Sequence, residues 1–285
     1  MRALRAALAC VLATFALPPL CRAQEPQRPG WVADFTVVAG NVLVGAVSAG
    51  AVQKARGGSF RDGFARGAAG GAGVYAGKRI AAARWAGAGL VGRQVAAVGS
   101  SVVWNAGHGR RSLEQVALPL GPLRFYVRPL GGGPRVRARL DAIAAGAAVY
   151  GALRPELKLD AARSLSSGTV VFSAPRHYFR HDGSTGSVGI AYHGTVYLSD
   201  LREISPEGRR TTFSHERVHV LQGDAVFMAL GLPAQEWLAP RIPGGRRVAR
   251  WIDLDVASPL VTLAGAAMRY DERPWEMEAS YLSER

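Results

Sequence analysis

The sequence predicts an α+β protein in which a glycine-rich helical region precedes a mixed domain, and three patterns support this fold class. Residues 35–112 are rich in glycine, alanine and valine, with glycines repeated at helical spacing. Several short stretches between 123 and 199 alternate apolar with polar side chains, as half-buried strands do. Two later segments carry apolar residues at the spacing of helices that bury one face.

The first 23 residues have the composition of a secretory signal peptide. Arg2 and Arg5 give a positive start, an apolar run follows, and Ala23 is a small residue at the exit. Both cysteines, Cys10 and Cys21, lie inside this segment, and a lipid-modified cysteine fits poorly because the preceding residues are not small. We expect an exported, periplasmic or envelope-associated protein whose mature chain has no thiol for a metal or a disulfide.

Two regions of different composition follow this leader. We expect residues 24–122 to form a Gly/Ala-rich helical region and residues 123–285 to form the second domain. The helical region repeats glycine at four-residue spacing, at Gly63, Gly67 and Gly71 and again at Gly73 and Gly77. Small residues at this spacing let another helix backbone approach closely, which predicts tightly packed helical hairpins.

The sequence leaves open whether this region meets a membrane. Residues 35–53 carry no charge and are long enough to span a bilayer, but Asn41 and three glycines weaken that interpretation. Charged residues interrupt the later stretches. The alternatives are membrane association through residues 35–112 and a soluble helical layer packed on the second domain.

The expected strands are short and rich in β-branched and aromatic residues. They lie at 123–128, 136–140, 169–172, 188–192 and 195–198. Glycines join the first two, and the turn-like pair His193 and Gly194 joins the last two. Residues 141–153 fit either a strand or a helix. A strand at the sheet edge can bind an extended peptide by backbone pairing, and the alternative is an ordinary hairpin that binds nothing.

An HExxH pentad begins at His215 and ends at His219. Residues four apart on a helix leave the same face, so both imidazoles can bind one metal ion. Glu216 lies beside that ion, where it can accept a proton from a water molecule that the metal acidifies. We expect hydroxyl side chains at 211–214 to cap this helix and residues 231–233 to end it. The pattern indicates a zinc hydrolase, and the alternative is a pair of ordinary histidines.

A tetrahedral catalytic zinc takes three protein ligands and leaves one position for water, so a third ligand is needed. A second helix is expected at 273–281, with Pro274 in its first turn, where the missing N–H is least harmful. It carries Glu276 and Glu278, which point about 200° apart around the axis. Only one of these two glutamates should reach the metal.

Three segments together resemble the gluzincins, a group of zinc metallopeptidases: 194–199, then 214–222 with the pattern HExxHxxQ, then 273–279 with the pattern P-[aromatic]-E-x-E-A. In that group an edge strand precedes the HExxH helix, and a later helix supplies a glutamate. The resemblance covers residues 187–281 and implies a zincin-like metallopeptidase domain that acts on a peptide or protein substrate. It implies the following roles: zinc ligands His215, His219 and Glu276, and general base Glu216.

The chain departs from the gluzincins at one position. Several of them carry an aspartate directly after the alanine of the later helix, where this chain has Ser280. A carboxylate there commonly orients a metal-bound imidazole, so the site geometry or the activity is expected to be altered. Asp224 and Asp271 are the candidate substitutes.

The transition state also needs a donor for the developing oxyanion. Four side chains are candidates for this donor: His193, Tyr270, Arg273 and Tyr281. The remaining histidines, at 108, 177 and 181, lie in polar or glycine-rich segments and are expected to face solvent.

The formal charge of +14 falls to +11 when the three arginines of the leader, Arg2, Arg5 and Arg22, are removed. An exported basic protein is drawn to anionic lipid surfaces, so an anionic membrane is a candidate partner. Nucleic acid is an unexpected partner, because no zinc-finger, basic-zipper or RNA-recognition pattern is present.

These observations favour a zinc-dependent hydrolase, a metallopeptidase by resemblance. The alternative is an envelope or membrane-associated structural protein that keeps a zincin scaffold with little turnover, which Ser280 and the large glycine-rich region favour. A third interpretation, a glycine-zipper membrane protein with a coincidental pentad, predicts that no metal binds.

Overall fold

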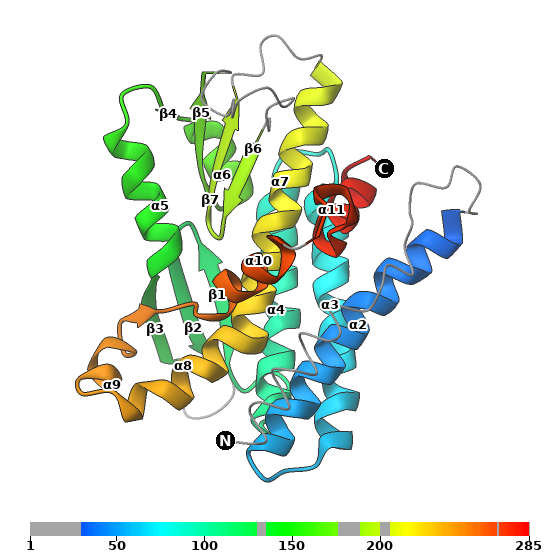
Figure 1. Ribbon diagram of the computed structural model, residues 1–285, viewed down its shortest axis with the longest axis vertical. Helices are drawn as coiled ribbons and strands as arrows, with labels where there is room; N and C mark the ends of the chain where they lie inside the picture. Colours follow the sequence, from blue (N-terminus) through cyan, green and yellow to red (C-terminus); the bar gives the residue numbers. More distant parts are fainter. Residues whose placement is uncertain (1–29, 130–134, 176–188, 200–205, 267, 285) are drawn as a thin grey trace.

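The computed structural model describes residues 30–129, 135–175, 189–199, 206–266 and 268–284 (Figure 1). It has the α+β fold predicted from the sequence: three long N-terminal helices, two four-stranded sheets, and a long later helix that carries His215 and His219. The expected leader, residues 1–23, lies outside the described residues, as do His177 and His181.

The described chain begins with α2 (Gly30–Ala55), α3 (Phe60–Ala82) and α4 (Ala88–Gly107). One glycine face of α3 packs on α2, where a side chain on Gly67 or Gly71 would overlap backbone atoms of Gly45 or Asn41. The opposite face packs on α4, and a side chain on Gly77 would overlap the backbone of Ala96. The predicted close packing of helices is confirmed, and α3 uses separate glycines for each neighbour.

Helix α2 contains the apolar stretch Trp31–Ala55, which is long and apolar enough to cross a membrane. Its C-terminal half is covered by α3, whereas Trp31 and Phe35 are 71% and 69% exposed. The same length and composition suit a membrane anchor, a signal sequence or a helix of a soluble core. The membrane topology of residues 35–112 stays a prediction.

The first sheet contains β1 (Val116–Leu120), β2 (Leu123–Arg128), β3 (Arg135–Asp141) and β8 (Ile252–Asp253), in that spatial order. β2 and β3 are the antiparallel pair expected from their alternating apolar and charged residues, with Leu123 opposite Leu140. The sequence pattern missed β1 and β8. β8 pairs with β3 through only two residues, too few for a periodic signal.

The second sheet has the order β4 (Lys158–Leu159), β5 (Val170–Ala174), β7 (Thr195–Ser199), β6 (Gly189–Tyr192). β6 and β7 form the expected hairpin, and β6 is an edge strand among the described strands. The ambiguous segment is a helix, α5 (Ala142–Leu153), because the Asp141 side chain accepts a hydrogen bond from the Ala144 N–H and caps its start. Helix α6 (Ala161–Ser167) follows β4.

The metal-bearing helix, α7 (Pro206–Val226), is longer at its start than expected. Residues 211–214 therefore lie inside the helix, and the expectation that they cap it was wrong. The expected end at 231–233 was also wrong. A π-helical segment, Phe227–Gly231, leads directly into α8 (Leu232–Leu238), because Pro233 occupies the first turn of α8, where its missing N–H is tolerated.

The chain closes with α9 (Gly245–Val248), α10 (Ala257–Ala266) and α11 (Pro274–Ser283). α7 lies at the centre of the molecule (Figure 1). On one side its Val220 and Leu221 pack with Val171, Val196 and Leu198 of the second sheet and with Ala81 and Ala96 of the N-terminal helices. On another side, Val218 packs with Ala279 and Leu282 of α11, which holds the last helix against the metal-bearing one.

Candidate metal centre

Three side chains from two helices meet at one point. His215 and His219 of α7 and Glu276 of α11 bring one donor atom each within 4.8 Å of one another. The two Nε2 atoms lie 2.9 Å apart, and Glu276 Oε2 lies 3.3 Å from His215 Nε2 and 3.1 Å from His219 Nε2. These three residues are the metal ligands that the resemblance to the gluzincins predicted.

Local sequence explains how the two helices present these donors. The spacing of four residues places both imidazoles on one face of α7. Pro274 starts α11 in its first turn, which puts Glu276 near the N-terminal end of the helix, where a negative charge is favoured. Glu278, on the opposite side of α11, points elsewhere, as the helical geometry predicted.

The donor set and its spacing fit a tetrahedral ion of zinc type. Ligand distances of about 2.0–2.1 Å place neighbouring donors of a tetrahedron about 3.3 Å apart, within roughly 0.5 Å of the separations found here. Two imidazole nitrogens and one carboxylate oxygen are also a donor set that zinc uses in catalytic sites. The three residues could therefore hold a metal ion, although the geometry does not identify which one.

Gln222, the last residue of the HExxHxxQ run, fixes the proton position on His219. Its Nε2 donates to the Trp275 carbonyl and to Glu278 Oε2, so its Oε1 is the atom that faces His219 Nδ1 at 2.7 Å. The neutral ring then carries its proton on Nδ1 and turns the Nε2 lone pair toward Glu276. Two lone pairs at 3.1 Å require a proton or a cation between them.

A buried polar cluster behind the metal ligands ties them to the N-terminal helices. Glu278 accepts hydrogen bonds from Lys78 at 2.7 Å and from Asn41 at 2.6 Å, in addition to Gln222. Burial opposes ionisation of Glu278, but Lys78 and the hydrogen bonds of Asn41 and Gln222 outweigh it and lower its pKa. The contacts of Gln222, Lys78 and Asn41 in this cluster were not predicted from the sequence. The pattern HExxHxxQ, in which Gln222 follows His219 by three residues, was the one sequence feature that pointed to any of them.

Glu216 lies beside the ligands and against the edge strand of the second sheet. It is 5% exposed, and its carboxylate occupies the space that a side chain on Gly189 of β6 would fill. Burial raises its pKa, the two imidazoles oppose that effect, and the Glu276 carboxylate adds to it. A carboxylate with a raised pKa is a better proton acceptor near neutral pH.

Of the four candidate oxyanion donors, Tyr270 is the one that contacts the metal ligands. Burial and a hydrogen bond with Glu276 raise its pKa, so its hydroxyl stays protonated and able to donate near neutral pH. Arg273 stacks on the Tyr270 ring at 5.4 Å. Tyr281 donates instead to Asp34 Oδ1 at 2.7 Å. His193, the remaining candidate, lies in a different buried cluster, 3.6 Å from Asp141 and 3.4 Å from Asp255.

Two further expectations are corrected by the contacts. Asp224 does not serve the imidazoles, because its two oxygens bind Arg93 and Arg124. Gln222 instead orients the His219 ring, as an aspartate at the position of Ser280 does in several gluzincins. The Asp271 side chain is not among the described side chains. His108 does not face solvent: its side chain is 1% exposed and its Nε2 lies 2.6 Å from Glu236.

The chain was compared with protein-family models, with curated proteins and with solved structures, and none of them matches it. The geometry of this site is therefore the main indication of what the protein does.

Proposed function

We propose that the protein is a zinc-dependent hydrolase, specifically a metallopeptidase that cleaves peptide bonds. The observation that carries this proposal is the meeting of His215, His219 and Glu276 at tetrahedral spacing, with the buried Glu216 directly beside them. The likeness to the gluzincin motifs supports the same ligand set. Export to the periplasm or cell envelope is part of the proposal and is supported by the composition of residues 1–23 and the apolar α2.

The proposed reaction assigns a role to each of these residues. When bound, zinc would polarise the substrate carbonyl and lower the pKa of a water molecule. Glu216 would take the proton as the water oxygen attacks the carbonyl carbon, and would pass it to the amine as the C–N bond breaks. Tyr270, whose hydroxyl hydrogen-bonds Glu276, would donate a hydrogen bond to the developing negative charge.

A peptide substrate is supported by the position of the edge strand. β6 borders the second sheet among the described strands, and its Gly189 touches the Glu216 carboxylate. A peptide that paired with this strand would run past the proposed general base, with its backbone held by strand hydrogen bonds.

Metal analysis and one substitution test the proposal. The purified protein and its Glu216→Gln variant are analysed for bound metal and incubated with a denatured protein mixture. We expect zinc in both proteins and cleavage by the wild type alone, with the variant slower by about 10²-fold or more. Equal fragment patterns would contradict the peptidase. Metal without cleavage would favour the structural-scaffold alternative, and absence of metal would contradict the metal centre itself.

A further inference from the structure

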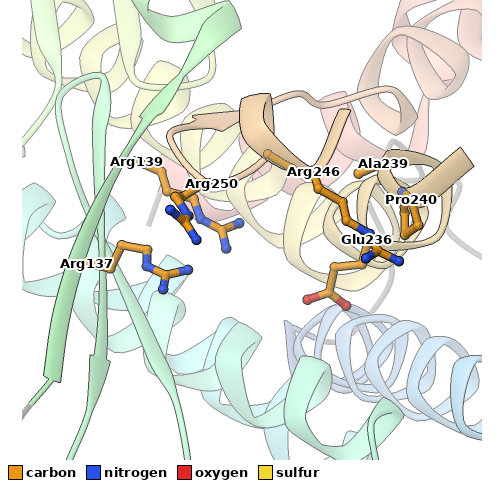
Figure 2. Close-up of a pocket in the computed structure, with 8 residues that line it drawn as sticks. Arg137, Arg139, Glu236, Ala239, Pro240, Arg246 and Arg250 are labelled. Carbon is orange, nitrogen blue, oxygen red and sulfur yellow. The ribbon is translucent and has the colours of Figure 1, made fainter. Parts of the chain in front are cut away.

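A pocket of about 260 Å³ lies on a part of the molecule that the metal centre does not use. Its walls come from β3, which contributes Arg137 and Arg139, and from the segment around α9, which contributes Arg246 and Arg250 (Figure 2). Glu236 of α8 supplies the only carboxylate among its lining residues. Residues more than one hundred positions apart in the sequence thus gather four guanidinium groups around one space.

Of the four arginines, Arg139 is paired with Asp253, and the positive charge of the other three is not balanced by the described residues. Glu236 is already engaged by His108 at 2.6 Å, and Asp253, which lies 3.3 Å from Arg139, is shared with Arg124. Arg137, Arg246 and Arg250 have no acidic partner in the described part of the chain. These three arginines are exposed, so water screens their mutual repulsion, and their guanidinium groups remain available to an anion that binds in the pocket.

Arg139 lines the pocket and carries one N–H group without a partner among the described residues. Arg139 is largely buried, with 15% of its side chain exposed, and its Nε has no hydrogen-bond partner among the described residues. A buried N–H without an acceptor is unfavourable. The hydrogen-bonding capacity of the Arg139 guanidinium is therefore not fully used by the described residues.

The chemistry of the lining residues indicates the class of anion. All four cations are arginines, whose planar donor fork matches the oxygens of phosphate and can bind two of them together. A phosphate group carries a charge of about −1.5 to −2 at neutral pH, more than a single carboxylate. The small volume suits one phosphate group better than an extended ligand.

We propose that this arginine pocket is a binding site for a phosphate group, either free or as the phosphate of a lipid headgroup. The two sources differ in how they would involve the exposed apolar side chains of the same segment. Val248 and Trp251, 42% and 62% exposed, flank Arg250 and would enter a bilayer if the phosphate belonged to a lipid.

The test measures binding of inorganic phosphate by calorimetry and binding to vesicles by sedimentation. One set of vesicles is pure phosphatidylcholine, and the other contains phosphatidic acid in addition. The pocket variant is Arg246→Gln with Arg250→Gln. The control is Arg61→Gln with Arg79→Gln, which removes the same charge from exposed positions of α3.

We expect the pocket variant to bind about tenfold to a hundredfold more weakly than the wild type, and the control to change little. Phosphate binding that depends on the pocket would indicate a free ligand. Pocket-dependent binding to phosphatidic acid vesicles without binding of free phosphate would indicate the lipid. The proposal is overturned if neither probe binds, or if the control loses as much binding as the pocket variant. Metal content, measured on the same variants, tests the proposed metal centre independently of anion binding.

Discussion

At the scale of single residues, Gly189 determines where the proposed general base can lie. A Cβ added there would stand 2.7 Å from Glu216 Oε1, closer than such atoms approach. The clash involves Cγ, Cδ and Oε1 of Glu216 and no backbone atom, so the glutamate side chain would have to turn away while the backbone stays in place. The glycine therefore affects the position of the carboxylate more than the stability of the fold.

We predict that Gly189→Ala lowers the rate of peptide cleavage by about tenfold or more, because a misplaced carboxylate transfers the proton poorly. Bound metal and thermal stability should stay close to wild type. Gly146→Ala is the matched control, since a side chain at Gly146 meets nothing within 4 Å. An active Gly189→Ala enzyme would show that Glu216 does not need the position seen here.

Gln222 acts on the metal through His219. Its Oε1 holds the Nδ1 proton, and its Nε2 is anchored on Trp275 and Glu278. We predict that Gln222→Ala weakens metal binding by about 10–100-fold, measured by competition with a chelator. Gln94→Ala, which removes a glutamine–carbonyl hydrogen bond to Pro119 elsewhere, is the control. Equal metal affinity in both variants would mean that the tautomer is fixed without Gln222.

At the scale of elements, α3 is the helix whose glycines decide how close its neighbours come. Gly71 of α3 lies directly on the backbone of Asn41 in α2, and the Asn41 side chain continues to Lys78 and Glu278. The spacing between these two helices therefore also sets the distance between Asn41 and the cluster behind the metal ligands. A small change in helix packing would reach the site through these hydrogen bonds.

We predict that Gly71→Ala lowers the free energy of unfolding by about 1–3 kcal/mol, because the added methyl group overlaps backbone that cannot rotate away. Gly40→Ala on α2 is the control, since a side chain there meets nothing within 4 Å. It should be neutral or stabilise by up to about 1 kcal/mol, as expected for alanine in a helix. Urea unfolding of both variants measures these free energies. A loss of stability in Gly71→Ala alone would show that helix packing, and not helix propensity, causes the effect.

Local patterns predicted the elements whose signal is periodic. The alternation in β2 and β3, the glycine spacing of α3 and the pentad on α7 are patterns within continuous stretches of the chain, and all three were found. Helical geometry predicted that only one of Glu276 and Glu278 would face the metal, and the resemblance to the gluzincins named Glu276. Pairings between distant segments were missed, including Asn41 with Glu278, Arg124 with Asp253 and the arginine pocket. A short stretch of sequence does not indicate which distant residue a buried charged side chain will contact.

At the scale of the whole molecule, a buried charge network joins the two sheets and the helices around α7. Its guanidinium groups are those of Arg93, Arg124 and Arg139, and its carboxylates those of Asp141, Asp224, Asp253 and Asp255. Three positive charges thus face four negative ones. His193 lies between Asp141 and Asp255, and its protonated ring would make the count equal.

The pKa of His193 agrees with this role. Burial lowers it, but the Asp141 carboxylate, with Asp255 and Asp224, outweighs burial and raises the pKa above its usual value. The unfolded chain titrates near 6.5. Protonated His193 therefore stabilises the fold fully below about pH 6.5, and this contribution is lost as the pH rises through the raised folded pKa.

We predict that His193→Asn destabilises the protein most at low pH. Asparagine tolerates the positive φ of 48° at this turn, so the substitution removes the charge with little backbone strain. The difference in unfolding free energy from wild type should be about 1–3 kcal/mol near pH 6 and should shrink as the pH rises further. Urea unfolding across this range measures it, and subtraction of the two curves removes the other titrating groups. A difference that stays constant or grows with pH would show that His193 is neutral in the folded protein, and that the network carries an uncompensated negative charge.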